Sequence, residues 1–384
     1  MKYKLEEIVD VTMGQSPKSE YYNIEGKGYP FLQGNRTFGF KYPTFDTYTT
    51  VMTKSAKAGD VIMSVRAPVG DLNITPVDMC LGRGVCSLRM KNGNQSFLFY
   101  MMKYYIPHLV RKESGTVFGS VNRNDINGLE VDIPEDFLIQ EKIARYLEMI
   151  DEKIELSNKI NNNLEQQAMA IFNNAIEHSK SVTYVELGSL ADVKGGKRLP
   201  KGANLMSIPN SHPYIRVRDL NDVVFASLSA NYEYVDDETQ KTISRYITTT
   251  DDVLISIVGT IGLTAIVDKS LNMANLTENC VKVTNLHGIS PEYLLLYLRS
   301  QHGSEEIKKG TVGAVQAKLP IKNIQALSVP LLPQSDLQLL NDTLKVLFNQ
   351  LSINVAESKC LTDIRDSLLP KLMSGELDVS DIDL

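Results

Sequence analysis

The chain has 384 residues, of which 43% are hydrophobic and 22% charged, a composition typical of globular proteins and a length too great for one ordinary core. No apolar run approaches the roughly 20 residues of a membrane-spanning helix, and the first residues lack the apolar core of a signal peptide, so we expect a cytoplasmic protein. Taken as an average, the net charge of −6 argues against a polyanionic partner.

The negative charge is concentrated in two segments. Residues 136–178 carry four basic and eight acidic side chains, and residues 334–384 carry four and nine. Residues 1–135 and 179–333 have net charges of +2 and +1. The average therefore hides an alternation, in which an acidic segment closes each half of the chain.

The two halves repeat one another. Each opens on a similar phrase, KLEEIVDVTMGQSPK from Lys4 and ELGSLADVKGGKRLPK from Glu186. Five further pairs follow in the same order: YPFLQGNR and HPYIRVRD, GDVIMSVRAPVGD and DVLISIVGTIG, LGRGVCSLR and LTENCVKV, FLFYMMKY and YLLLYLRS, and SGTVFGSVNRNDINGLEVDIP and KGTVGAVQAKLPIKNIQALSVPLLP. A shared order indicates a duplication more strongly than any single match does.

Each copy begins as a compact domain. Runs of period two bounded by Gly, Pro and Asn predict strands, and one short amphipathic segment predicts a helix that packs on them. We therefore predict the α+β class, with two similar globular domains at residues 1–135 and 179–333.

Each copy ends in a long helix. Apolar residues spaced four and three apart predict one helix over 136–178 and a second over 334–372, each about 60 Å long, followed by a tail at 373–384. We expect the two helices to pair as an antiparallel coiled coil with a pseudo-twofold axis between the halves. Both seams turn polar, at Ser157 and Asn161 and at Asn354 and Ser358, which would fix the register. The predicted apolar seam consists of Ile143, Leu147, Ile150, Ile154, Leu164, Ile171, Leu340, Leu344, Leu347, Leu351, Leu361 and Leu368.

The usual catalytic motifs are missing from the sequence. It has no Walker A loop, no GxGxxG after a strand, no GxSxG elbow, no HExxH helix and no Asp-Pro-Pro-Tyr loop. The four cysteines form no CxxC pair, so we expect reduced, mostly buried thiols and no metal site. An acid at Glu135 or Asp136 precedes the D-x-K triplet Asp151–Lys153, but about 22 Å of helix would separate them, so we interpret the triplet as a solvated face. We predict a chain that is not itself catalytic.

These features together resemble a known family. The phrases VTMGQSPKSEYYN, PFLQGN, GDVIMSVRAPVGDLNI with CLGRG, IPEDFLIQEKIARYLEMIDEKI and LLPKLMSGEL are similar to the DNA-specificity (S) subunit of type I restriction-modification systems, over essentially the whole chain. The resemblance implies that each domain is a target-recognition domain reading one half of an asymmetric bipartite DNA site, and that the helices set the unread spacer. It also implies two methyltransferase (M) subunits, which bind S-adenosylmethionine and methylate adenine, and restriction (R) subunits that use ATP and magnesium. No cofactor is expected in this chain itself.

Two readers of different half-sites should share their backbone and differ at exposed polar positions, because base edges are read by polar side chains. Accordingly, Gln15 and Ser16 align with Lys197 and Arg198, and Gln33 with Arg216. Arg216 and Arg218 alternate in a predicted strand and would share one face. The predicted DNA-contacting residues are Gln15, Ser16, Lys18, Gln33, Asn35, Arg36, Arg66, Arg83, Thr116, Ser120, Arg123, Lys194, Lys197, Arg198, Lys201, Arg216, Arg218, Lys308, Lys309, Thr311 and Gln316.

Rival interpretations stay open at this point. Arg216 and Arg218 are also suited to a structural ion pair with Asp219 or a neighbouring acid, and Arg66 and Arg83 to pairs with Asp71 or Asp78. For the whole chain, the alternative is a duplicated scaffold that binds proteins without DNA specificity, which the acidic net charge slightly favours. A free-standing nuclease or methyltransferase is opposed by the missing motifs.

Overall fold

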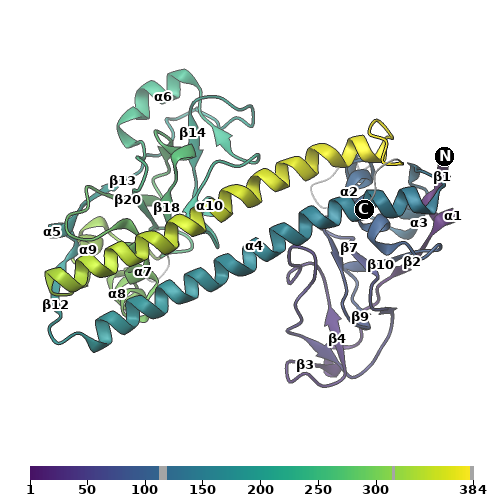
Figure 1. Ribbon diagram of the computed structural model, residues 1–384, viewed down its shortest axis with the longest axis horizontal. Coiled ribbons are helices and arrows are strands. Elements are labelled where there is room, and N and C mark those ends of the chain that lie inside the picture. The colour runs from purple at the N-terminus through teal and green to yellow at the C-terminus, as the bar shows by residue number, and fades with distance from the viewer. Residues whose placement is uncertain (112–118, 314–315, 381–384) are drawn as a thin grey trace. The chain divides into compact units, whose positions relative to one another are not determined.

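The computed structural model describes residues 1–111, 119–313 and 316–380, and the chain divides into two compact units. The first unit contains Met1–Asn158 and Ala356–Leu384, and the second contains Lys159–Val355. Figure 1 shows the two long helices, α4 (Phe137–His178) and α10 (Gln334–Met373). Each long helix therefore contributes about half of its length to each unit. The α+β class with two globular domains and two long helices agrees with the sequence prediction.

The first unit contains a four-stranded sheet of longer strands, a five-stranded sheet of shorter strands and a two-stranded pair near the chain terminus. The four-stranded sheet contains more residues and is called the larger sheet below. The four-stranded sheet has the order β2 (Val9–Met13), β10 (Val85–Met90), β7 (Val61–Ser64) and β8 (Leu72–Ile74). The five-stranded sheet has the order β3 (Tyr22–Asn23), β5 (Tyr48–Thr49), β4 (Tyr29–Leu32), β9 (Met79–Leu81) and β6 (Ser55–Ala56). β1 (Lys2–Lys4) pairs with β11 (Glu130–Asp132), and the shorter helices are α1 (Leu5–Ile8), η1 (Ser19–Tyr21), α2 (Gln95–Arg111) and α3 (Arg123–Asn127).

The second unit repeats this plan, with five strands in its larger sheet and three in its smaller one. Its larger sheet has the order β13 (Asp192–Gly195), β20 (Cys280–Thr284), β17 (Val253–Ser256), β18 (Thr264–Val267) and β15 (Phe225–Ala226). Its smaller sheet has the order β16 (Glu233–Tyr234), β14 (Pro213–Ile215) and β19 (Asn275–Leu276), and β12 (Thr183–Glu186) pairs with β21 (Ser328–Leu331). The shorter helices are α5 (Leu187–Leu190), η2 (Val217–Leu220), α6 (Asp237–Ile243), η3 (Ser244–Tyr246), η4 (Lys269–Leu271), α7 (Pro291–Arg299), α8 (Gln301–Gly310) and α9 (Ile321–Gln325).

A helix covers the larger sheet in each unit, and its aromatic residues form the centre of the core. In the first unit, Phe97 and Tyr100 of α2 are fully buried, and in the second unit Tyr293 and Tyr297 of α7 are too. α7 begins where Ser290 caps it, with Pro291 in the first turn, where a missing N–H costs nothing. Met101 and Met102 are also buried in the core of the first unit.

The long helices bury a seam that differs in detail from the predicted one. Ile143, Leu147 and Leu351 are buried as expected, but Ile171 is 36% exposed while Phe172 is 2% exposed. In a straight helix, residues seven apart differ in direction by about 20°, which adds up to about 80° over four heptads. Since consecutive residues differ by about 100°, the buried position is then the next residue along the helix. The same drift brings Leu369 of α10 inside, next to the half-buried Leu368. Of the other predicted seam residues, Ile154, Leu340 and Leu344 are buried, and Ile150, Leu164, Leu347 and Leu361 are half-buried.

Buried polar side chains interrupt the helix pair in both units. In the second unit, Asn354 Nδ2 donates a buried 2.9 Å hydrogen bond to Asn161 Oδ1, which confirms the predicted polar position. In the first unit, Asp151 is 1% exposed and lies 2.7 Å from Arg365 Nη1. The prediction that Asp151 lies on a solvated face was therefore wrong, because the heptad template counts an acid as a surface residue. Since residue numbers rise along α4 as their partners fall along α10, the helices are antiparallel within each unit.

Candidate nucleic-acid interface

The turn GDVIMSVRAPVGD is held by one serine. Ser64 Oγ donates to the carbonyl oxygen of Pro68 (2.8 Å) and accepts from the N–H of Asp71 (2.9 Å). The N–H of Gly70 donates to the carbonyl oxygen of Ser64 (3.0 Å), and Gly70 has a φ of 98°, which favours glycine.

The second domain makes the same turn with the same bonds. Ser256 Oγ donates to the carbonyl oxygen of Thr260 (2.6 Å) and accepts from the N–H of Leu263 (2.9 Å). Gly262, with a φ of 87°, donates to the carbonyl oxygen of Ser256 (3.0 Å). The alignment of these two stretches from the sequence is therefore confirmed atom by atom.

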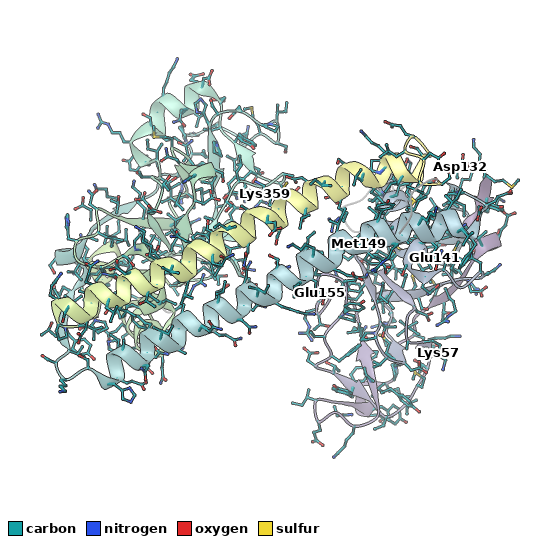
Figure 2. The ribbon with its side chains drawn as sticks, viewed as in Figure 1. Lys57, Asp132, Glu141, Met149, Glu155 and Lys359 are labelled. Carbon is teal, nitrogen blue, oxygen red and sulfur yellow. The ribbon has the colours of Figure 1, made fainter. Side chains whose placement is uncertain are left out.

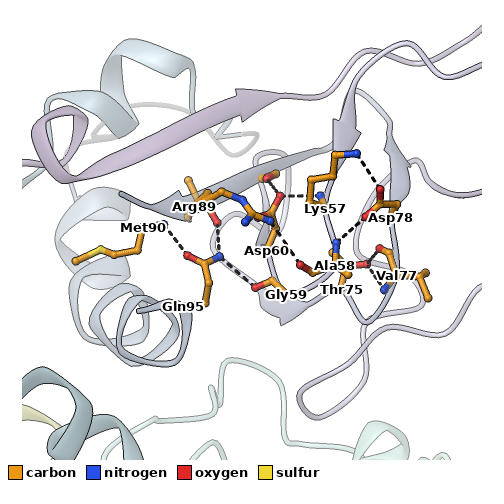
Figure 3. A network of polar contacts seen from close by, with 12 residues as sticks. Lys57, Ala58, Gly59, Asp60, Thr75, Val77, Asp78, Arg89, Met90 and Gln95 are labelled. Carbon is orange, nitrogen blue, oxygen red and sulfur yellow. Dashed lines mark hydrogen bonds and ion pairs between the residues drawn. The ribbon is translucent and has the colours of Figure 1, made fainter. Parts of the chain in front are cut away.

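In the first domain, the buried carboxylate of Asp60 stabilises the loop that precedes β7 (Figure 3). Asp60 is 3% exposed, and its Oδ2 accepts from the N–H of Lys57 (2.8 Å) and from Ser87 Oγ (2.7 Å). The guanidinium of Arg89 forms an ion pair with Asp60 at 2.5 Å. Buried charges need such partners, since an isolated carboxylate is costly to desolvate.

The second domain keeps the carboxylate and changes its partner. Asp252, also 3% exposed, accepts from the N–H of Thr249 (2.7 Å) and pairs with Lys282 Nζ (3.0 Å). Lys282 is paired across the sheet with Leu254, as Ser87 is with Ile62 in the first domain. The backbone is thus repeated while the polar side chains around it differ.

A glycine in each domain brings the first candidate loop against a second turn. Gly14 donates to the carbonyl oxygen of Val85, and Gly196 donates to that of Cys280, both at 3.0 Å. A Cβ at Gly14 would lie 2.0 Å from the Gly82 carbonyl oxygen, and one at Gly196 would lie 2.0 Å from that of Thr277. Only glycine therefore allows this close approach.

In the first domain, three of the predicted residues meet at this place. Ser16 Oγ donates to Gln33 Oε1 (2.8 Å) and accepts from the backbone N–H of Arg83 (3.0 Å). Gln15, between the glycine and Ser16, donates its own N–H to the Leu81 carbonyl oxygen. Gln33 and Arg83 are exposed and Ser16 is half-buried, so the cluster presents neutral amide and hydroxyl groups beside one guanidinium.

The neighbouring candidates Asn35 and Arg36 are held by acids. Asn35 Nδ2 donates to Asp71 Oδ2 at 2.5 Å, and Arg36 makes two hydrogen bonds to Asp46, the shorter one of 2.7 Å. The Arg36 side chain lowers the pKa of the Asp46 carboxyl by hydrogen bonding to it. Lys18 lies 3.8 Å from Glu20 at the surface.

Arg66 and Ser120 lie side by side, because they form a β-bridge and Val121 donates to the carbonyl oxygen of Val65 (3.0 Å). Arg123 begins α3, which Asn122 caps. The rival pairings for Arg66 and Arg83 do not occur in the part of the chain that the structure describes. Asp71 accepts instead from Asn35, and Asp78 pairs with Lys57 at 2.8 Å. Thr116 lies outside the described residues.

In the second domain, charged pairs stand where the first has neutral groups. Arg198 Nε lies 2.7 Å from Glu278, and Arg198 is 81% exposed. The ammonium of Lys197 lies 5.4 Å from the centre of the Tyr246 ring, and Lys194 pairs with Asp192 at 3.0 Å. Lys201 is exposed.

The prediction that Arg216 and Arg218 share one face of a strand was wrong. The strand β14 ends at Ile215, and Val217–Leu220 form the 3-10 helix η2. Both guanidinium groups instead reach Glu233, and Arg218 lies 2.8 Å from its Oε2. The ion-pair alternative is therefore what the structure contains. Burial raises the pKa of the nearby Asp219 carboxyl against the pull of both arginines.

The loop predictions after α8 also need correction. Lys308 and Lys309 lie in the last turn of that helix, not in a loop, and Lys309 pairs with Glu306 at 3.2 Å. Thr311 Oγ1 donates to the carbonyl oxygen of Ile307, and Gln316 is exposed.

The position equivalent to Ser120 is Lys318, which sequence reasoning missed. Lys318 bridges Val258 as Ser120 bridges Arg66, and Leu319 donates to Ile257 as Val121 does to Val65. Counted from the Gly-Thr pair that both copies share, Lys318 lies three positions further along the chain than Ser120 does, and this insertion hides the match in the sequence.

Within the described ranges, no group of three or more His, Cys, Asp or Glu side chains is arranged to hold a metal ion. Cys80, Cys86 and Cys280 are buried free thiols, and Cys360 is exposed. None of the helices that the structure describes is both long and apolar enough to cross a membrane.

Comparison with known proteins gives one family. A family model described as the type I restriction modification DNA specificity domain matches residues 1–166 and again 179–361. The putative type I restriction enzyme MjaX specificity subunit of Methanocaldococcus jannaschii is 36% identical over 170 residues, which are 44% of this chain and 40% of that protein. The MjaIX specificity subunit of the same organism is 22% identical over 414 residues, with 99% of this chain and 94% of that protein covered.

A solved structure shows the same fold. The type I restriction-modification system S subunit from M. genitalium is 17% identical, with a TM-score of 0.58 over 97% of this chain and 95% of that one. Because the family model accounts for both copies of the repeat and for most of the sequence, the chain belongs to the family of the type I restriction modification DNA specificity domain, which it carries twice.

Proposed function

We propose that the chain reads an asymmetric, two-part DNA sequence, with one recognition domain for each half, as the non-catalytic specificity subunit of a type I restriction-modification complex. The carrying observation is the repeated turn, in which Ser64 and Ser256 hold the same backbone while neighbouring side chains differ. A shared backbone presents both readers in the same way, and different polar groups select different bases.

The two readers differ in the chemistry they offer. The first domain presents the amide of Gln33, which suits adenine, and the hydroxyl of Ser16, which can donate to or accept from any base. The second presents the guanidinium groups of Arg198 and Arg216, which suit guanine or phosphate. The Arg198 pair with Glu278 is exposed, and such pairs contribute only about 0–1 kcal/mol, so exchange for a DNA partner costs little.

The outer faces of the long helices support a role in assembly. Leu339, Val346 and Ile353 repeat every seven residues on α10 and are 69%, 68% and 60% exposed. On α4, Met149 and Leu156 are 49% and 55% exposed, and Figure 2 shows Met149 among its side chains. Apolar side chains at helical spacing bind partner helices. We propose that these stripes bind two M subunits, one for each half of the repeat, and that R subunits join the complex through them.

Two further properties belong to the same proposal. The long helices set the length of the unread spacer between the half-sites. S-adenosylmethionine, ATP and magnesium would be held by the M and R subunits.

The test is a genome-wide map of methylated adenines in cells with and without this chain. We expect one asymmetric split motif to lose its methylation when the chain is removed and to regain it on complementation. An unchanged map would contradict the proposal.

A second measurement distinguishes a DNA-reading subunit from a protein-binding scaffold. The complex of the chain with its M partner should bind duplex DNA that carries the motif in preference to a scrambled duplex, and the affinity should fall as salt rises. Formation of the complex without any sequence preference would support a protein-binding scaffold instead.

A further inference from the structure

Lys41 is a buried lysine in the loop between β4 and β5 of the first domain. It is 7% exposed, and its Nζ lies 3.3 Å from Oε1 of Glu148 on α4. Ser96 of α2 donates to the same oxygen at 2.7 Å. A charged pair buried to this degree is held in one geometry, because either charge alone would be costly to desolvate.

The loop that carries Lys41 also carries Gln33, Asn35 and Arg36. Its backbone is tied to the sheet next to Lys41, where the N–H of Ile74 donates to the Lys41 carbonyl oxygen at 2.8 Å. The side chain of Lys41 then ties the loop to the long helix. The loop that bears the proposed base-reading groups is therefore fixed to both the sheet and α4.

The second domain has an arginine in a corresponding role. Arg299, the last residue of α7, donates through Nη2 to the carbonyl oxygens of Val223 and Thr264, the latter at 2.7 Å. Its Nη1 lies 3.5 Å from Glu165 Oε2 on α4. Burial raises the pKa of the Glu165 carboxyl, while the charge of Arg299 opposes that shift.

Val223 is the third residue after η2, the segment that carries Arg218 and is capped by Arg216. Arg299 thus joins the proposed reading segment of the second domain to α4, as Lys41 does in the first. The two links use different residue types on different elements, yet each joins a reading segment to a carboxylate of the same helix. This convergence is not visible in the repeat, since Lys41 and Arg299 do not align.

We propose that Lys41 and Arg299 are positioning residues, each of which fixes the DNA-reading segment of its own domain against α4 and so maintains specificity for one half-site. This inference rests on the proposed function. Hydrogen bonds to base edges depend on the placement of donors and acceptors, so a displaced segment loses discrimination between bases while phosphate contacts keep the complex on DNA.

The test uses the complete complex in cells, with the methylated-adenine map as readout. Lys41→Met should broaden the motif in one half only, with discrimination at the affected positions falling about tenfold, within the range that one mismatched pair normally costs. Glu148→Gln should broaden the same half, although Glu148 belongs to the helix and not to the reading loop. Arg299→Met should broaden the other half. Lys41→Arg, which keeps the charge, should restore the wild-type motif.

The matched control is Arg145→Met, which removes an exposed ion pair with Glu152 from α4 and should leave both halves unchanged. If Lys41→Met and Glu148→Gln broaden both halves equally, or neither half, the inference is overturned. If Lys41→Met abolishes methylation, the milder Glu148→Gln decides by the same criterion. A wild-type chain that directs no split motif would contradict the proposed function itself, which is a distinct result.

Discussion

The buried ion pair between the long helices offers a quantitative prediction for Asp151→Asn. Asp151 is 1% exposed and accepts hydrogen bonds from Arg365 Nη1 (2.7 Å) and from the Tyr100 hydroxyl (2.8 Å). Burial, together with the charge of Asp151, raises the pKa of the Tyr100 phenol, which keeps it protonated as a donor. The substitution preserves the shape of the side chain and removes its charge.

The loss of unfolding free energy depends on Arg365, which stays buried after the substitution. Arg365, 8% exposed, loses its buried counter-ion and keeps only the exposed carboxylate of Asp366, at 2.7 Å. Breaking a buried pair costs about 3–5 kcal/mol in free energy of unfolding. Replacing both partners with apolar residues, as in Asp151→Leu with Arg365→Met, should cost far less, because no charge then remains buried. Lys153→Met is the matched control, since Lys153 pairs with Glu357 across the same two helices at 3.3 Å with both side chains about half exposed. That pair should contribute about 0–1 kcal/mol.

The measurement is urea unfolding of the full chain, combined with hydrogen exchange of the α10 amides around residue 365. Exchange reports the first unit directly, which matters because two units need not unfold in one step. We expect a large loss of protection for Asp151→Asn and almost none for Lys153→Met. Equal effects of the two variants would show that Asp151 is not buried against Arg365 in solution.

Gly14→Ala should lower the free energy of unfolding by more than about 2 kcal/mol, since its Cβ would meet the Gly82 carbonyl oxygen, whereas Gly34→Ala, with open space around it, should be nearly neutral in the same denaturation assay. Val346→Asp with Ile353→Asp should abolish co-purification with the M subunit without changing the melting temperature; retained binding would place the contact elsewhere. Burial lowers the pKa of Lys103 to about 8. The unfolded chain therefore binds more protons than the folded chain between about pH 8 and pH 10.4, so stability should rise with pH across that window, and Lys103→Met should remove this rise in pH-dependent unfolding.

Much of the fold could be predicted from the sequence, because the repeat preserves spacing where the backbone needs it. The serines at 64 and 256 and the glycines at 14 and 196 align, and each pair makes the same backbone contacts. These are local requirements of a turn, and local requirements leave a pattern in the sequence.

The side-chain partners could not be predicted, because they depend on segments far apart in the chain. Glu233 accepts from Arg216 and Arg218 only because β16 pairs with β14, which no local pattern indicates. Asp151 faces inward because Arg365 lies opposite, although a hydrophobic repeat treats an acid as a surface residue. Polar contacts between distant elements therefore need the three-dimensional structure.

An exchange of domains tests whether two different readers define the target. Equivalent backbone hydrogen bonds join the two ends of each domain. The N–H of Leu5 donates to the Leu129 carbonyl oxygen, and that of Leu187 donates to the Leu327 carbonyl oxygen, both at 2.9 Å. These matched positions allow residues 187–327 to be replaced by a second copy of residues 5–129. The methylated-adenine map should then show the first domain's half-site on both sides of a split motif, less sharply read by the copied domain, whose Lys41 has no Glu148. A motif that still contains both original half-sites would contradict the assignment of one reader to each half.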